Sequence, residues 1–154
     1  MALEIERKFL VKQTDFLKPL TGQKYRQAYL SSHKKRTVRI RLAGEHAYLT
    51  VKGKSNGPVR KEYEYRIPFS EGQELLRLCP KPYIEKTRYK LAYEGKIWEI
   101  DVFENDNEGL VMAEIELSSP DEAFISPDWL GEEVTKDPRY YNSNLAKHPY
   151  SEWK

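Results

Sequence analysis

The chain has 154 residues, of which 39% are hydrophobic and 32% are charged, so it can bury a core and is too apolar for a disordered chain. Its 26 basic and 24 acidic side chains nearly cancel, which excludes a strong overall field that would attract nucleic acid or a membrane surface. Cys79 is the only cysteine, so the chain forms no disulfide within itself. Because no apolar stretch approaches membrane-spanning length, we expect a cytoplasmic protein that binds neither nucleic acid nor membrane.

Short runs of alternating polar and apolar residues, separated by turn residues, cover most of the chain up to position 118. Such alternation is typical of strands whose two faces differ. The predicted strands are, in chain order, 3–11, 24–31, 36–42, 47–54, 59–68, 83–93, 96–104 and 110–118. Short glycine turns predict hairpins that join the third strand to the fourth and the sixth to the seventh.

Two segments break this alternation. Segment 70–79 predicts a short helix, with Ser70 as its N-cap and an apolar side formed by Leu75, Leu76 and Leu78. After Pro120 the sequence predicts an irregular or weakly helical tail anchored by Phe124, Trp129 and Leu145. Antiparallel strands with little helix predict a mainly β fold, a closed eight-stranded antiparallel barrel with a few short outer helices, in one domain over 1–154, because closure removes exposed strand edges.

One face of most predicted strands carries two or three ionisable side chains. These are Glu4, Glu6 and Lys8, then Arg39 and Arg41, Arg60 with Glu62 and Glu64, Lys86 with Arg88, Glu99 with Asp101, and Glu114 with Glu116. The fourth strand carries Lys52 beside Thr50 on the corresponding face. Like charges two positions apart repel unless an opposite charge lies between them, so a bound cation would relieve the acid pairs and a bound polyanion the basic pairs. The pattern leaves open whether these faces point outward to water or inward to a lumen.

If these faces converge, their chemistry suits phosphoryl transfer. Carboxylates are the ligands that Mg²⁺ and Mn²⁺ prefer, and arginine and lysine bind phosphate oxygens. Phosphoryl transfer depends mainly on positioning and charge neutralisation, which such a mixture supplies. No phosphate-binding glycine loop and no Gly-x-Ser-x-Gly nucleophile motif offers a competing interpretation.

The segment Glu4-Ile-Glu6-Arg-Lys8-Phe-Leu resembles the opening motif of the CYTH superfamily, the triphosphate tunnel metalloenzymes. Further segments resemble the successive strand motifs of that family: Gln27-Ala-Tyr29-Leu30, Arg39-Ile-Arg41, Thr50-Val-Lys52, Glu62-Tyr-Glu64, Glu85-Lys86-Thr-Arg88-Tyr89, Glu99-Ile-Asp101-Val-Phe103 and Glu114-Ile-Glu116. The segments from Gly131 to Thr135 and from Asp137 to Ala146 resemble the ending of short bacterial members. The resemblance covers nearly the whole chain, and the ordered set is far more specific than its opening motif.

The resemblance implies that the charged faces point into a tunnel and assigns roles to their residues. It implies that a triphosphate is held by Lys8, Arg39, Arg41, Lys52, Arg60, Lys86 and Arg88. It implies that two ions, Mg²⁺ or Mn²⁺, are held by Glu4, Glu6, Asp101, Glu114 and Glu116, with Glu62 and Glu64 in support. The catalytic residues would be Lys86, Glu6 and Glu116, with Lys86 stabilising the leaving phosphate.

The same resemblance gives two structural expectations. The tail around Arg139 is expected to close one end of the tunnel. The helix 70–79 and the tail are expected to cover the outward-facing apolar residues Leu3, Ile5, Ile40, Val51, Ile100 and Ile115.

The favoured function is hydrolysis of inorganic tripolyphosphate to pyrophosphate and phosphate, because the short length and the ending resemble members with that activity. The alternatives are hydrolysis of an organic triphosphate, such as thiamine triphosphate or a nucleotide, and class IV adenylyl cyclase chemistry. A polyphosphate-binding module without catalysis is a non-enzyme alternative, although such a module would not need all the acids. A homodimer is possible and nothing in the sequence decides it.

Overall fold

The computed structural model of the protein describes residues 3–153. Its strands are β1 (Leu3–Val11), β2 (Gln23–His33), β3 (Arg36–Ala43), β4 (His46–Gly53), β5 (Val59–Ile67), β6 (Ile84–Tyr93), β7 (Lys96–Phe103), β8 (Val111–Glu116) and β9 (Leu130–Glu133). Its helices are α1 (Phe69–Leu78) and α2 (Asn142–Lys147), with short 3₁₀ turns at Asp15–Leu17, Asn105–Asn107, Pro138–Tyr140 and Tyr150–Glu152.

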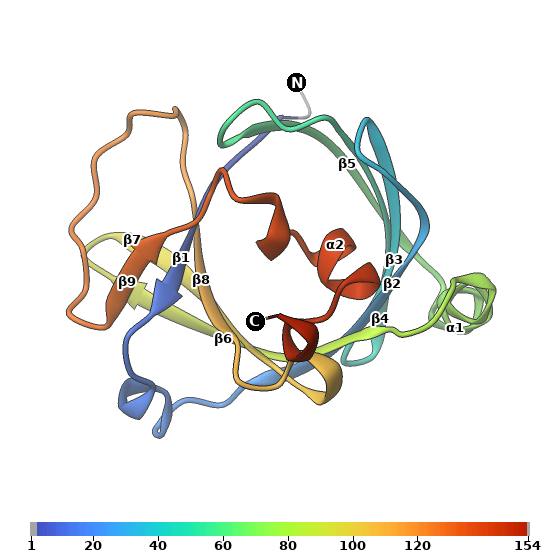
Figure 1. The fold of residues 1–154 in the computed structure, drawn as a ribbon, viewed down its shortest axis with the longest axis horizontal. Helices are drawn as coiled ribbons and strands as arrows, with labels where there is room; N and C mark the ends of the chain where they lie inside the picture. The colour runs from blue at the N-terminus through green and yellow to red at the C-terminus, as the bar shows by residue number, and fades with distance from the viewer. Residues whose placement is uncertain (1–2, 154) are drawn as a thin grey trace.

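The first eight strands form a closed barrel within residues 3–153 (Figure 1). Around the ring the order is β5-β4-β3-β2-β6-β7-β8-β1, and β1 returns to β5, with every neighbouring pair antiparallel. Among residues 3–153, the contact that closes the ring pairs Leu3, Glu4 and Ile5 of β1 in register with β5. The predicted closed antiparallel barrel, its hairpins and the helix near 70–79 are therefore confirmed. The prediction of Ser70 as the N-cap is wrong, because the helix begins at Phe69 and Pro68 holds the cap position.

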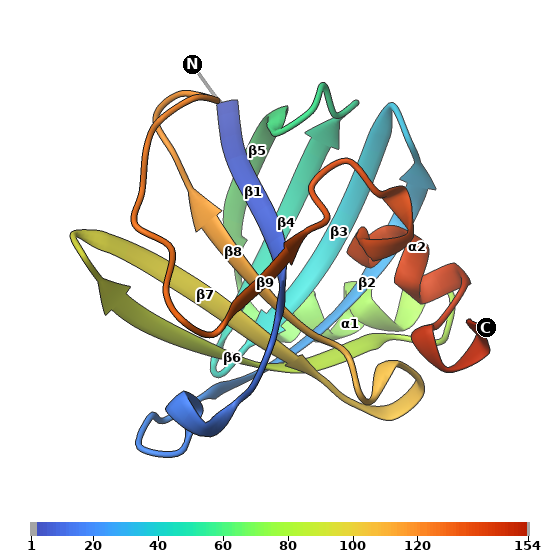
Figure 2. The same cartoon turned by 60° about the vertical axis from the view of Figure 1, so that its left-hand side comes forward.

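The ninth strand was not predicted. Beyond Ile5, β1 separates from β5, and Phe9 to Val11 pair instead with β9 (Figure 2). The expectation of an irregular or weakly helical tail is therefore wrong at Leu130–Glu133, because the free edge of β1 offers backbone hydrogen bonds that the tail satisfies. Gly131 permits the close approach, since a Cβ there would lie 2.8 Å from the carbonyl oxygen of Leu10.

Two apolar clusters cover parts of the outer barrel wall. Helix α1 packs Leu76 against Ile40, Leu42 and Ala47. On the other side, Trp98, Ile100 and Ile115 pack under Leu17 and the tail residues Phe124 and Trp129. The expectation that all the outward apolar residues are covered is wrong for Leu3, which is 42% exposed.

Helix α1 lies against the barrel at a glycine. A Cβ added to Gly72 would lie 2.4 Å from the Cβ of Ala47, so the helix cannot keep its position with any larger residue. We expect Gly72→Ala to lower the free energy of unfolding by about 1–3 kcal/mol through this overpacking, despite the higher helix propensity of alanine. Urea denaturation measures this change, with the exposed Gln73→Ala as control. Equal or higher stability of Gly72→Ala would contradict the fixed position of α1.

The C-terminal tail closes one end of the barrel. From β9 the chain crosses to α2, which contacts β2 and β6, and in the view down the barrel the tail lies within the ring (Figures 1 and 2). Leu145 is fully buried and belongs to one apolar cluster with Ile84, Phe103 and Met112. Among residues 3–153, no helix is both long and apolar enough to span a bilayer.

Candidate active site in the barrel lumen

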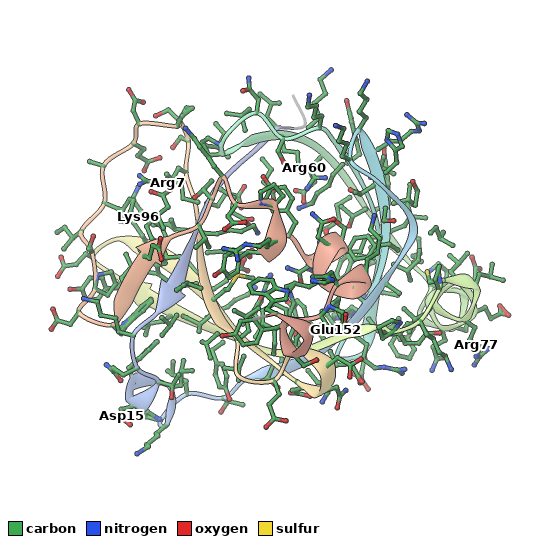
Figure 3. All side chains as sticks on the ribbon, in the orientation of Figure 1. Arg7, Asp15, Arg60, Arg77, Lys96 and Glu152 are labelled. Atoms are coloured by element: carbon green, nitrogen blue, oxygen red, sulfur yellow. The ribbon has the colours of Figure 1, made fainter. Side chains whose placement is uncertain are left out.

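The charged faces of the strands point inward and line a cavity of about 360 Å³. Figure 3 shows Arg60 within the outline of the barrel, whereas Asp15 and Arg77 project away from it. Period-two alternation explains this arrangement, because residues two apart on a strand share a face and closure of the sheet turns that face into the lumen. The question that the sequence left open is thereby answered: the charged faces point inward.

The lumen changes in chemistry along its length. At the end closed by the tail, Ile84 and Met112 are buried and apolar. Two residues further along β6 comes Lys86, and two residues further along β8 comes Glu114. The lumen therefore passes from an apolar floor, through a buried ionic layer, to a wetter acidic region in which Glu116 is exposed.

Three carboxylates form an acidic cluster in the lumen. Glu6 on β1, Glu99 on β7 and Glu114 on β8 each offer an oxygen atom, and these atoms all lie within 4.8 Å of one another. Burial raises the pKa of Glu6, with a further contribution from Glu114, and burial also raises the pKa of Glu99. Oxygen donors this close are the kind of ligands that Mg²⁺, Mn²⁺ and Ca²⁺ prefer, so the residues present fit a divalent cation.

Two basic side chains already lie against this cluster. Lys8 donates to Glu6 at 3.0 Å and also to Glu114, and Arg88 donates to Glu114 at 3.1 Å and to Glu99 at 3.2 Å. Although burial opposes it, the charge of Glu114 and then of Glu6 raises the pKa of Lys8. Lys8 and Arg88 thus supply positive charge where a metal ion would otherwise be the main cation.

On β3, elsewhere in the barrel wall, the positive charge of Arg41 is poorly compensated. Arg41 donates its Nε–H to Gln27 at 2.8 Å and stacks on the ring of Tyr25, but no acidic group among residues 3–153 forms an ion pair with it. Burial lowers the pKa of Arg41 to about 10, and the charges of Arg39 and Arg88 add to the effect. An anion bound here would relieve the repulsion.

Arg39 and Arg60 extend this basic region. Arg39 is only 8% exposed and makes a 3.4 Å ion pair with Glu64, and its buried Nε has no hydrogen-bond partner within the part of the chain that the structure describes. Arg60 donates to Thr37 and to a backbone carbonyl, and has no acidic partner in the described part of the chain. Together with Arg41, these residues form an arginine cluster with donors available for phosphate oxygens.

Lys86 lies between the basic region and the apolar floor. It is 1% exposed, and its Nζ lies 2.8 Å from Asp101 Oδ2 and 2.9 Å from Asn142 Oδ1. Burial lowers the pKa of Lys86 to about 7, although Asp101 opposes the shift. A lysine with such a pKa can hold or release a proton near neutral pH.

The structure brings nearly all the predicted site residues to the lumen. Those that line the cavity are Glu4, Glu6, Lys8, Arg39, Arg41, Lys52, Arg60, Glu62, Glu64, Lys86, Arg88, Glu114 and Glu116. Asp101 does not line it, because both its oxygens face Arg88, at 2.7 and 2.8 Å, and one also faces Lys86. Arg139 is exposed and pairs with Asp137, so the end of the barrel is closed by other tail residues.

Three residues of the site were missed by the site prediction. Glu99 belongs to the acidic cluster, and its alternation with Asp101 had already placed it on the charged face. Gln27, which is fully buried, alternates with Tyr25 and Tyr29 and could have been found in the same way. Asn142 reaches the lumen from the tail, where no alternation indicates which side chain points inward.

The fold and the site define a class of protein, a closed antiparallel barrel whose lumen holds both an arginine cluster and a carboxylate cluster. Such a lumen is suited to binding a polyanion together with a metal ion. The chain belongs to the CYTH domain family, whose model matches residues 2–147. It is 52% identical over its full length to an inorganic triphosphatase from Acetivibrio thermocellus, covering 99% of that protein. An inorganic triphosphatase from Nitrosomonas europaea is 40% identical over 93% of the chain and 96% of its own length.

A solved structure agrees with this assignment. The crystal structure of an inorganic triphosphatase superposes with a TM-score of 0.67 at 36% identity, covering 92% of this chain and 96% of the other. Because the match covers most of both chains, it supports the same barrel fold for this protein.

Proposed function

We propose that the protein hydrolyses inorganic tripolyphosphate to pyrophosphate and phosphate inside the barrel, with Mg²⁺ or Mn²⁺ as cofactor. In this reaction a water oxygen bonds to a terminal phosphorus atom and the bond from that atom to the bridging oxygen breaks. The observation that carries the proposal is that one lumen holds both the arginine cluster and the carboxylate cluster. The curated relatives named inorganic triphosphatase support the same substrate.

The arginine cluster is proposed to bind the phosphate chain. Arg41 and Arg60 lack acidic partners among residues 3–153, and Arg39 makes one long ion pair with Glu64 and one hydrogen bond to Thr50. All three therefore keep donors that can turn toward phosphate oxygens. Lys8 and Lys52 form ion pairs with carboxylates, and each would also contact the phosphate oxygens of the substrate. Arg88 already donates to three carboxylates, so its main role here is to hold the acids in place.

Lys86 is proposed to act on the leaving group. Its buried position and lowered pKa allow it to hold a proton close to the oxygen on which negative charge develops when the bridging bond breaks. The apolar floor formed by Ile84, Phe103 and Leu145 keeps water away from this end of the lumen. The attacking water is therefore expected to come from the acidic side, where Glu116 is exposed.

The carboxylate cluster is proposed to hold the metal cofactor. Glu6, Glu99 and Glu114 would hold one ion, and Glu116 with Glu4 would hold a second, since burial and the charge of Glu4 raise the pKa of Glu116. Bound there, Mg²⁺ or Mn²⁺ would neutralise phosphate charge and lower the pKa of an attacking water. Arg88 occupies both oxygens of Asp101 but only Oε1 of Glu99, and Glu99 belongs to the carboxylate cluster, so we propose Glu99 in place of Asp101 as a ligand. Cys79, buried and unpaired, suits a reducing cytoplasmic location.

The test compares phosphate release from tripolyphosphate, thiamine triphosphate and ATP, each with Mg²⁺, with Mn²⁺ and with a chelator. We expect metal-dependent release that is fastest from tripolyphosphate and absent with the chelator. Preference for thiamine triphosphate or ATP would indicate an organic triphosphatase, and cyclic AMP formed from ATP would indicate a cyclase. Binding of tripolyphosphate without hydrolysis under every condition would contradict an enzymatic function and favour a polyphosphate-binding module.

A further inference from the structure

We infer that Asn142, the first residue of α2, is a positioning residue that fixes the amino group of Lys86 for the reaction. The inference rests on the proposed function and assigns to the C-terminal tail a part in catalysis. Asn142 lines the cavity and lies at the junction of two barrel strands, since its side chain reaches Gln27 on β2 and Lys86 on β6.

The hydrogen bonds determine how the Asn142 amide is oriented. Its Oδ1 accepts from Lys86 Nζ at 2.9 Å and from Gln27 Nε2 at 3.0 Å. Because a protonated lysine can only donate, the oxygen of the Asn142 amide must face it. Gln27 is fully buried, and its own oxygen accepts from Arg41 Nε, so its amide must present the nitrogen to Asn142. The hydrogen-bonded chain Arg41–Gln27–Asn142–Lys86 therefore allows one orientation of each of the two amide groups.

These contacts fix the direction in which the remaining N–H bond of Lys86 points. Asp101 and Asn142 occupy two positions around Nζ, at 2.8 and 2.9 Å, and no third acceptor within residues 3–153 forms a hydrogen bond with it. An ammonium group has three N–H bonds, so one remains for an oxygen of the substrate. With Asn142 removed, only Asp101 would hold the amino group, which could then rotate about that contact.

Docking of the tail does not depend on this contact. Leu145 is fully buried in the apolar cluster at the barrel floor, and the backbone N–H of Tyr150 donates to Asn107 Oδ1 at 2.8 Å. Within the tail, Asn144 donates its side-chain N–H to the carbonyl of Pro138 at 2.7 Å. A residue needed only for docking would not have to place a polar atom on the buried lysine.

The experiment compares Asn142→Leu, which has similar volume and no acceptor, with Asn142→Asp, which keeps an oxygen for both donors. Asn144→Ala is the matched control, because it removes a hydrogen bond of the same helix without touching Lys86. Turnover of tripolyphosphate gives kcat and KM, calorimetry with tripolyphosphate in chelator gives binding, and thermal melting gives stability. We expect Asn142→Leu to lose kcat by about 10- to 100-fold, since small misplacements of a reacting group have effects of this size.

The same variant is expected to keep its tripolyphosphate affinity in chelator, and Asn142→Asp is expected to keep a higher kcat than Asn142→Leu. Asn144→Ala should turn over substrate as the wild-type protein does. Wild-type kcat in Asn142→Leu, or equal losses in the Leu and Asp variants, would overturn the inference. A joint loss of melting temperature, binding and kcat, as expected for Leu145→Ala, would show that Asn142 only docks the tail. If the wild-type protein itself does not hydrolyse tripolyphosphate, the proposed function fails and the role of Asn142 with it.

Discussion

Replacing Lys86 by methionine is expected to lower kcat for tripolyphosphate by about 10²- to 10⁴-fold, the range typical for loss of a proton donor or of a charge that stabilises a leaving group. The side chain is buried between Asp101 and Asn142, and no other basic group among residues 3–153 forms an ion pair or hydrogen bond with both. Steady-state kinetics at saturating metal measure the effect. Activity within tenfold of wild type would exclude Lys86 from the chemical step.

The same variant is expected to remain folded. Burial already disfavours the charged form of Lys86, as its pKa of about 7 indicates. Replacing it by an apolar side chain of similar length should therefore change the free energy of unfolding little. Asp101 keeps its two hydrogen bonds to Arg88 when the lysine is gone. Thermal melting should therefore place Lys86→Met close to the wild-type protein. Lys24→Met, which removes a lysine that pairs with Glu104 outside the lumen, controls for the loss of one positive charge.

The barrel could be predicted from the sequence because it follows from a local pattern, the alternation of polar and apolar residues along each strand. Alternation such as that of Glu4, Glu6 and Lys8 fixes which side chains share a face of a strand. A chain of antiparallel strands then has few ways to hide both its edges and its apolar faces. The direction of the charged faces needed more than local pattern, because alternation is identical for a sheet turned inward or outward.

The parts that could not be predicted depend on pairings between distant segments. Asp101 has the same local pattern as a metal ligand, yet the register of β6 and β7 sets it opposite Arg88, which occupies both its oxygens. Strand β9 forms because β1 leaves its edge free beyond Ile5, a consequence of barrel geometry alone. Asn142 enters the lumen because Leu145 anchors the tail at the floor, and no residue near Asn142 in sequence encodes that contact.

The pairing of Lys8 leads to the second large effect. Its amino group donates to Glu6 and Glu114, two of the three carboxylates proposed to hold the metal, so a bound ion and the lysine must compete for the same oxygens. Lys8→Met should therefore bind Mn²⁺ more tightly than the wild-type protein when triphosphate is absent, by about tenfold or more, because a unit charge a few ångströms away contributes several kcal/mol at a partly buried site. Titration with Mn²⁺ followed by electron paramagnetic resonance measures this affinity.

Activity should change in the opposite direction. A lysine displaced from Glu6 and Glu114 becomes available to phosphate oxygens, so in the wild-type protein triphosphate and metal should strengthen each other's binding. In Lys8→Met this mutual strengthening should be lost and kcat/KM should fall by about 10²-fold or more, the usual effect of removing one charge-stabilising contact. Lys12→Met, at an exposed lysine beyond the end of β1, should change neither quantity. Equal or weaker Mn²⁺ binding by Lys8→Met would mean that the lysine does not compete with the metal, and that its place among the acids serves only to hold them together.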